Sequence, residues 1–489
     1  MIFKKSGFVL LVLFLTGCTH VPRDGDFSTV EKLVAERIPQ KVHWYQGGDE
    51  DAQVKTVLDN LLKEPLTAQS VVQIALLNNR RLQSEYEELG IAQADLVQAG
   101  LLSNPVLFAS FRFPKGGDGG NNVEFDLAKE FLDILLRPAR QRLAATEFGR
   151  AKLRVANAVL DLAAEVQIAF YRAQGMQQLS RVLKVSADAA QASYQIAQRF
   201  DEAGNISELK LAQERSAAAD VSAERMRTNA GLQNARDDLN RLLGLTGAAR
   251  DWTLGHELQE LPATGPNPDL EEEVAIKRRL DLDEARQEIK QLAEALQIAR
   301  DYRWIGGATV GVNTERDPDG ARVTGPNLSV EIPVFDQHQA AIARLESQLA
   351  QSKSRCEALK IAIHNEVRTA INRVNAAREI VEYYRDELIP AREQVVKFTQ
   401  QEQNYMLEDV FELLFTRQQE TQAYRGYIEA LTDYWMARAE LARAVGVGLP
   451  EVANSAVLPS AEDNQPDQME KDSSMQHDTH SHNGDATHQ

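Results

Sequence analysis

Apolar residues recur at intervals of three and four positions along several long stretches of the chain that contain no proline. These proline-free stretches cover residues 66–104, 139–261, 269–317, 334–389 and 391–449. Apolar residues at this spacing share one face of an α-helix, and the absence of proline allows the helix to continue, so the pattern predicts unusually long helices. A helix from Pro138 to about Phe200 would extend on the order of 90–100 Å at about 1.5 Å per residue. Many alanines lie between the apolar positions, which favours thin helices packed closely side by side.

A strict alternation of apolar and polar residues appears in two shorter patches. Apolar side chains occupy alternate positions in 122–127 and in 327–332, and similar segments precede these patches at about 106–113 and 308–314. Polar loops rich in Gly, Pro and Asp separate the members of each pair. Period two is typical of β-strands, so we expect two β-hairpins, each with an apolar face and a polar face that includes Glu124, Asp126 and Glu331. This alternation fits a sheet with one face in water, and equally a barrel with lipid outside and an aqueous lumen.

The order helix, hairpin, long helix, turn and helix occurs twice, at about 67–244 and 268–446. The segment Leu239–Gly244 parallels Leu441–Gly446, and Leu209–Gln213 matches Leu414–Gln418 at an offset of 205 residues. The sequence therefore predicts an internal repeat in a mainly α-helical fold with a small β part. The expected organisation is a signal peptide at 1–17, a lead-in at 18–64, a first repeat at 65–250, a linker at 251–268, a second repeat at 269–450 and a polar, low-complexity tail at 451–489.

The N-terminus has the features of a secretory signal. Lys4 and Lys5 precede the apolar run Phe8–Leu15, which is too short to span a bilayer. The following tetrad, Leu15-Thr16-Gly17-Cys18, resembles the lipobox of bacterial lipoproteins. This resemblance implies cleavage before Cys18 and attachment of lipid, including palmitate, to Cys18. Thr19 rather than Asp follows the cysteine, which in such lipoproteins favours transport to the outer membrane. The alternative is a buried helix that happens to contain a cysteine.

Composition excludes several function classes. The chain has 54 basic and 72 acidic residues, a formal net charge of −18, and no dense basic patch, which argues against nucleic acid as a partner. Two distant cysteines indicate no disulfide framework. The sequence contains no nucleophile–base pair, phosphate loop or zinc-ligand spacing, so we expect no enzyme activity and no resident cofactor. It also lacks a long uncharged apolar segment, so any membrane crossing must use β-strands.

Two hairpins supply too few strands for a closed barrel. A transmembrane barrel needs at least about eight strands, and an open sheet edge cannot be left in lipid. Other copies must therefore complete the barrel. A dimer would supply about eight strands and a trimer about twelve, and a water-filled lumen favours the trimer.

Together, the duplicated halves, Pro333 just past the final predicted strand and the Cys18 motif resemble the outer-membrane efflux protein family of TolC-like channels. The likeness extends over about residues 65–450 and points to the lipoprotein branch that serves tripartite export pumps. It implies a homotrimeric α-helical tube across the periplasm, capped by a β-barrel of about twelve strands, four from each chain. It also implies two partner proteins, a periplasmic adaptor and an inner-membrane pump, with outer-membrane lipid around the barrel.

The family resemblance also assigns roles to the two turns at the periplasmic end. It implies that they contact the adaptor through Phe200, Gly204, Asn205, Ile206 and Ser207 in the first turn and Tyr405, Met406, Leu407, Val410 and Phe411 in the second. The second turn departs from the family pattern, because Asp409 aligns with the position where the family usually has glycine. The alternative is that both are simple helix connections, which need Gly, Asn and Ser in any case.

Glu408, Asp409 and Glu412 are the candidates for a periplasmic gate, since family members place acidic residues near the closed aperture. Threefold repetition would turn each into a ring of carboxylates that attracts cations and repels itself as the aperture narrows. The alternative is an acidic face in contact with water.

The C-terminal tail indicates a cargo. Imidazole and thioether groups together suit copper or silver, and the tail gathers His477, His480, His482, His488, Met469 and Met475. We expect weak metal binding here, the alternative being a polar tail with chance clustering of histidines. The leading hypothesis is a passive exit duct for copper or silver ions served by a pump of the resistance–nodulation–division type. Export of organic toxicants or drugs, and a periplasmic coiled-coil adaptor or structural lipoprotein, are the alternatives.

Overall fold

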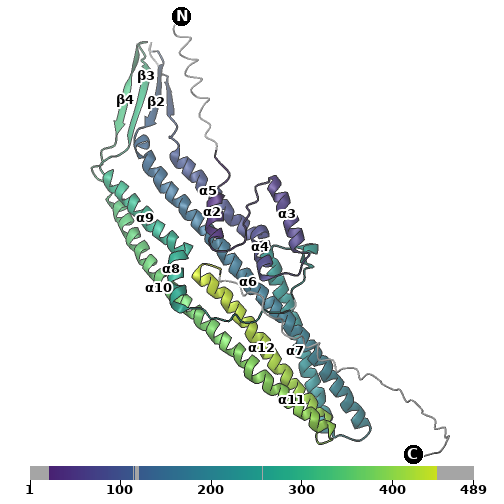
Figure 1. The fold of residues 1–489 in the computed structure, drawn as a ribbon. Helices are drawn as coiled ribbons and strands as arrows, with labels where there is room; N and C mark the ends of the chain where they lie inside the picture. The colour runs from purple at the N-terminus through teal and green to yellow at the C-terminus, as the bar shows by residue number, and fades with distance from the viewer. Residues whose placement is uncertain (1–20, 114, 116–119, 256, 449–489) are drawn as a thin grey trace, which may run out of the picture.

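The computed structural model describes residues 21–113, 115, 120–255 and 257–448. The molecule is elongated, with a β-sheet at one end and helix-connecting turns at the other (Figure 1). Long helices join the two ends, and the short helices α2 (Phe27–Ala35) and α3 (Asp49–Leu61) lie beside them near the middle. None of the helices in the described ranges is long and apolar enough to cross a membrane.

The same order of elements occurs in both halves of the chain. The first half contains α4 (Ala68–Asn78), α5 (Arg80–Gly100), β1 (Val106–Arg112), β2 (Asn122–Glu130), α6 (Leu132–Glu202) and α7 (Glu208–Leu243). A short 3-10 helix, η1 (Gly247–Arg250), follows. The second half contains α8 (Pro268–Arg278), α9 (Leu280–Asp301), β3 (Ala308–Arg316), β4 (Arg322–Val330), α10 (Gln339–Tyr383), the π-helical turn η2 (Tyr384–Leu388), α11 (Ile389–Asn404) and α12 (Val410–Val445). The predicted mainly helical class with a small β part is confirmed.

Prolines interrupt the long helices less than the sequence predicts. Helix α6 has 71 residues and begins before Pro138, which lies inside it. A proline this close to the start of a helix removes only one backbone hydrogen bond from a very long ladder. In the second half, Pro390 lies in the first turn of α11, directly after η2. The π-turn absorbs the irregularity, so the rod continues from α10 into α11.

The four strands form one antiparallel sheet in the order β1-β2-β3-β4. Strands β2 and β3 pair with each other, so the sheet joins the two halves. The predicted strand at 327–332 is wrong in its limits, because β4 covers Arg322–Val330 and Ile332 lies beyond it. The amide of Glu331 donates a hydrogen bond to the Gly307 carbonyl (2.7 Å), and Pro333 then ends the extended segment.

The register separates the side chains onto two faces. Directly paired residues share a face, and successive residues alternate between faces. The apolar face carries Leu107, Phe111, Val123, Phe125, Leu127, Val310, Val312, Leu328 and Val330. The polar face carries Ser110, Glu124, Asp126, Asn313, Glu315 and Asn327, together with Val106, Phe108 and Val323. Both faces lack a covering layer of helices (Figure 1).

The hydrophobic core lies near the middle of the molecule, where the short helices α4 and α8 contact the long rods. One cluster includes Ile74 of α4, Leu162 of α6 and Leu239 of α7. A second includes Val367 of α10 and Leu431 of α12. These side chains are at most 1% exposed, so the middle of the molecule is packed like the interior of a globular domain.

In each half, a polar side chain binds the C-terminal end of the last helix, but the residue differs between the halves. The side-chain amide of Asn79 donates to the Leu242 carbonyl (2.7 Å) at the end of α7. At the end of α12, the guanidinium of Arg279 donates to the Ala444 carbonyl (3.0 Å). Both groups satisfy carbonyls that have no partner within their own helix.

The lead-in segment connects the two halves. The buried guanidinium of Arg37 donates to the Arg278 carbonyl at 2.9 and 3.1 Å, and the amide of Gly448 donates to the Arg37 carbonyl at 2.9 Å. The last described residue therefore lies beside the lead-in, at the middle of the molecule.

Close packing of α6 against α12 gives a first prediction. A Cβ atom at Gly175 would overlap the β-branched side chain of Thr432, so Gly175→Ala should destabilise the protein by about 1–3 kcal/mol. Gly231→Ala in α7 is the matched control, because its Cβ would meet Met176 at an ordinary 3.6 Å and a helical alanine gains up to about 1 kcal/mol. Thermal unfolding followed by circular dichroism measures both. An equal rise in melting temperature for the two variants would contradict the predicted packing.

Candidate functional site: the helix tips and the sheet

The first tip is the turn between α6 and α7. Gly204 adopts a left-handed conformation, with φ of +71°, and the amide of Asn205 donates to the Phe200 carbonyl at 2.7 Å. The hydroxyl of Ser207 accepts a hydrogen bond from the amide of Lys210 (3.3 Å) and caps α7. The local sequence therefore ends one helix with glycine and starts the next with serine.

The second tip, between α11 and α12, repeats this geometry with different residues. Met406 occupies the left-handed position, with φ of +60°, and the amide of Leu407 donates to the Glu402 carbonyl (3.0 Å). The carboxylate of Asp409 caps α12 by accepting from the amide of Glu412 (2.7 Å).

The structure shows which residues of the two tips occupy equivalent positions. Met406 lies 202 positions after Gly204, and Asp409 lies 202 positions after Ser207. The glycines that end α7 and α12, Gly244 and Gly446, have the same spacing. The expected match of Asp409 with glycine, and the expected offset of 205 residues, are therefore wrong in this region. Asp409 is a helix N-cap, and Met406 takes the position of the glycine.

The tips differ in surface chemistry. Tyr405, Met406 and Leu407 are 78%, 93% and 73% exposed, so three consecutive large apolar side chains lie in the second tip without cover from the described chain. At the first tip the turn itself is formed by Gly204 and Asn205, which are small or polar, and Ile206 is half-buried. Val410 is also half-buried, and Phe411 is 4% exposed.

An aromatic contact holds the tips together. The rings of Phe200 and Phe411 lie 6.0 Å apart, nearly perpendicular, and the ammonium of Lys210 lies 4.9 Å from the centre of the Phe411 ring. Phe200 comes from the end of α6 and Phe411 from the start of α12. The structure thus brings together two of the predicted tip residues that are far apart in sequence.

The three predicted gate residues lie close together in the second tip. Glu408 and Asp409 precede α12, and Glu412 lies in its first turn, where a carboxylate is favoured by the helix dipole. Glu408 and Glu412 are exposed. A ring of carboxylates requires further copies of the chain and stays a prediction.

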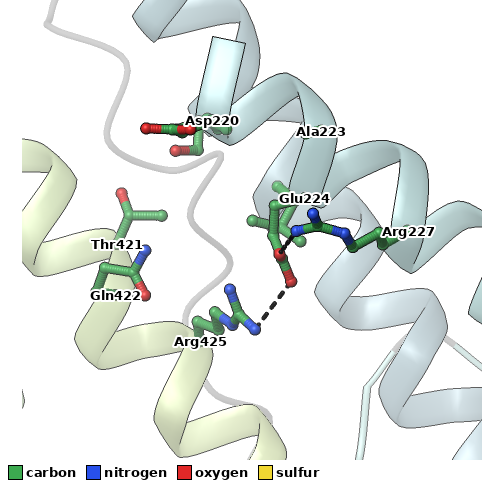
Figure 2. Close-up of a pocket in the computed structure, with 10 residues that line it drawn as sticks. Asp220, Ala223, Glu224, Arg227, Thr421, Gln422 and Arg425 are labelled. Carbon is green, nitrogen blue, oxygen red and sulfur yellow. Dashed lines mark hydrogen bonds and ion pairs between the residues drawn. The ribbon is translucent and has the colours of Figure 1, made fainter. Parts of the chain in front are cut away.

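Further from the tips, a charged link joins α7 to α12. Arg425 of α12 lies 3.0 Å from Glu224 of α7, and Arg227 lies 3.3 Å from the same carboxylate (Figure 2). These residues border a cavity of about 270 Å³. Burial acts against the charge of Arg425, but hydrogen bonding to Glu429, together with Glu224, raises the pKa of its guanidinium. The sequence alone does not reveal this link, because no local pattern relates residues so far apart.

Helices α11 and α12 are fastened to each other as well. The hydroxyl of Tyr424 donates to Glu393 at 2.5 Å, and burial followed by the negative charge of Glu393 raises the pKa of Tyr424. Arg392 donates to Gln419. The ring of Tyr384, in the π-turn η2, occupies the space that a side chain at Gly426 would fill.

On the polar face of the sheet, amide groups pair with carboxylates. The side-chain amide of Asn313 donates to Glu124 (2.9 Å), that of Asn327 to Asp126 (2.5 Å) and that of Asn122 to Glu315 (2.6 Å). A neutral donor satisfies a carboxylate oxygen without cancelling its charge. This face therefore keeps a negative charge that only Arg112, 3.6 Å from Glu124, partly offsets among the strand residues.

Some predicted sites lie outside the described residues. These are Cys18 and the tail residues Met469, Met475, His477, His480, His482 and His488. Within the described ranges, no group of three His, Cys, Asp or Glu side chains is arranged to hold a metal ion. Cys356 is a buried, free cysteine in α10.

A family model described as "Outer membrane efflux protein" matches residues 273–447. No curated protein matches the chain in sequence. The fold is similar to that of a membrane protein from Pseudomonas aeruginosa, with a TM-score of 0.66 and 17% identity over 78% of this chain and 92% of the other.

Two further solved structures share the fold. The CmeC outer membrane channel of Campylobacter jejuni gives a TM-score of 0.66 at 14% identity, over 78% of this chain and 85% of that chain. The open state of the MtrE outer membrane channel of Neisseria gonorrhoeae gives 0.63 at 15% identity, over 78% and 89%.

The left-handed residue at each tip gives a second prediction. Met406→Gly should stabilise the second tip by about 1 kcal/mol, because glycine adopts a positive φ without the steric cost of a Cβ atom. Gly204→Met should destabilise the first tip by a similar amount. Hydrogen exchange at the amides of Leu407 and Asn205 measures the two effects. Faster exchange at Leu407 in Met406→Gly would show that the methionine is not strained.

Proposed function

We propose that this chain, whose residues 273–447 match the outer membrane efflux protein family, is the outer-membrane exit channel of a tripartite efflux pump. The observation that carries the proposal is the sheet, in which one face is apolar and exposed and the other keeps carboxylates that neutral amides satisfy. The apolar face suits lipid, and the charged face suits a water-filled lumen.

The proposed assembly is a homotrimer. Four strands per chain cannot close a barrel of useful width, and β1 and β4 lie at the edges of the sheet formed by the described residues. Three copies would give about twelve strands and pair every edge. Fold likeness to CmeC and MtrE, which are described as outer membrane channels, supports this arrangement.

The tips are the proposed docking site of a periplasmic adaptor. The exposed apolar residues Tyr405, Met406 and Leu407 would bind apolar side chains of a helical hairpin. The first tip would contribute the polar turn around Asn205. The energy for transport would come from an inner-membrane pump of the resistance–nodulation–division type, so the channel itself is passive and has no catalytic role.

The same end of the molecule is the proposed gate. Rings of Glu408, Asp409 and Glu412 around a threefold axis would favour cations and oppose closure through mutual repulsion. Lipid on Cys18 would anchor the mature chain in the outer membrane.

The proposed cargo is copper or silver ions, and its support is the set of His and Met residues in the tail. Export of organic toxicants or drugs through the same channel is the alternative. A periplasmic adaptor or structural lipoprotein is disfavoured, because either would expose the apolar face of the four-stranded sheet to water, which is unfavourable.

The channel proposal predicts ion conductance. The purified full chain, added to a planar lipid bilayer, should open pores that prefer cations, and Glu412→Gln should weaken that preference because it removes one charge from each copy at the tip. Glu420→Gln is the control, since it makes the same charge change on the same helix beside Arg417. Absence of pores would reject the channel. An equal effect of both variants would reject the role of Glu412 in the gate.

The cargo proposal predicts a selective phenotype. In a strain that depends on this channel, deletion of residues 464–489 should lower tolerance of copper and silver and leave tolerance of dyes and detergents unchanged. Replacement of His477, His480, His482 and His488 by Gln keeps the length of the tail and should have the same effect. A strain that lacks the whole chain is the second comparison. If it keeps its metal tolerance but loses its tolerance of organic compounds, the cargo is organic toxicants or drugs.

A further inference from the structure

Charged residues in the four strands are sorted by sign between the two faces. All four carboxylates, Glu124, Asp126, Glu130 and Glu315, lie on the polar face. Three of the four basic residues, Lys129, Arg316 and Arg322, lie on the apolar face. The face proposed to meet lipid therefore carries only positive charge within the strands.

Arg316 and Arg322 are directly opposite each other across β3 and β4. Two like charges in this arrangement repel each other. The next residue on this face, opposite Arg316 on β2, is the apolar Val123. Lys129 differs from the two arginines, because its ammonium donates to the Ser103 carbonyl at 2.6 Å.

No carboxylate in the described part of the chain forms an ion pair with either arginine. Asp317 and Asp319 lie in the connecting turn, and the carboxylate of Asp319 accepts a hydrogen bond from the amide of Ala321 (2.9 Å). Both arginines are exposed. The pair thus presents two guanidinium groups on an apolar face without a counter-ion from the strands.

The position of the pair along the strand is informative. Strand β3 has 9 residues, Ala308–Arg316, which is within the length of about 9–11 residues that a tilted strand needs to cross a bilayer. At the helix end of the sheet, the flanking residues Trp304 and Phe335 are 59% and 93% exposed, as expected of aromatic residues at a membrane surface. The arginines lie at the opposite end, beside the hairpin turn, where the headgroups of the outer leaflet would be.

We propose that Arg316 and Arg322 together bind a phosphate group carried by a lipid of the outer leaflet. Guanidinium groups bind phosphate oxygens in pairs of charge-assisted hydrogen bonds, and a phosphate between two arginines removes their mutual repulsion. The inference rests on the proposed channel, which places this face in lipid. Each chain of the assembly would hold one such site.

The test uses the full chain in vesicles of phosphatidylcholine with and without phosphatidic acid, which carries a phosphate monoester. Mass spectrometry after detergent extraction counts the phosphatidic acid that stays with the protein. The double variant Arg316→Gln/Arg322→Gln should retain about tenfold less of it, the loss expected from one or two charge-assisted hydrogen bonds. Each single variant should fall in between.

Arg112→Gln is the matched control. Arg112 ends β1 at the same hairpin end of the sheet but faces the polar side and lies beside Glu124, so its loss should leave lipid retention unchanged. Misfolding is a poor explanation for a loss in the double variant, since removal of two like charges relieves repulsion. Equal retention by wild type and double variant, or an equal loss in Arg112→Gln, would overturn the proposal.

Two further measurements, competition by inorganic phosphate and conductance, distinguish a lipid site from a free-phosphate site and from failure of the channel proposal. Excess inorganic phosphate should compete only weakly, because a free ion lacks the acyl chains that keep the lipid at the apolar face; full displacement would identify a free-phosphate site and overturn the lipid assignment. Conductance in the same vesicles is measured in parallel. Pores without selective lipid retention reject the arginine site alone, whereas the absence of pores rejects the proposed channel.

Discussion

The arrangement of this chain depends on the backbone hydrogen bonds at the edges of its sheet. In the order β1-β2-β3-β4, the described residues leave one edge of β1 and one edge of β4 without a strand partner. Water can satisfy such edges, but this sheet also exposes Leu107, Leu127 and Leu328 on its apolar face. In the proposed channel, strands of other copies would continue the sheet and lipid would cover that face, so both requirements would be met together. The pairing of β2 with β3 already follows this rule inside the chain, because it joins hairpins from different halves.

The two tips show how one backbone design can acquire two surfaces. Both turns use a left-handed residue and a side-chain cap, at a constant spacing of 202 residues from Gly204 to Met406 and from Ser207 to Asp409. The first tip uses the residues that cost least in these positions. The second accepts a strained methionine and leaves it 93% exposed. Such strain does not stabilise the chain, and it is consistent with the adaptor contact proposed for this tip.

Sequence periodicity predicted the helices, the two hairpins and the duplication, because each of these is encoded by neighbouring residues. It placed the ends of elements less well. Pro138 and Pro390 seemed to bound helices, but a proline near the start of a helix or after a π-turn costs little. The register at the second tip was missed because Asp409 was matched with glycine, although Asp, like Ser207, is a favoured N-cap residue; its carboxylate accepts a hydrogen bond from the Glu412 amide. Contacts such as Phe200 with Phe411 and Glu224 with Arg425 depend on how separate rods pack, which no local pattern records.

The duplicated halves build their long rods differently. The first connects the sheet to its tip through α6, a single helix of 71 residues. The second uses α10 and α11, which the π-turn at Tyr384–Leu388 separates. A π-turn breaks the regular hydrogen-bond ladder, and Pro390 lacks the amide that would restore it. The second tip is therefore not positioned by its own rod alone. Phe411 packs on Phe200, and Arg425 pairs with Glu224, so contacts with the first half set where the apolar residues of the second tip lie.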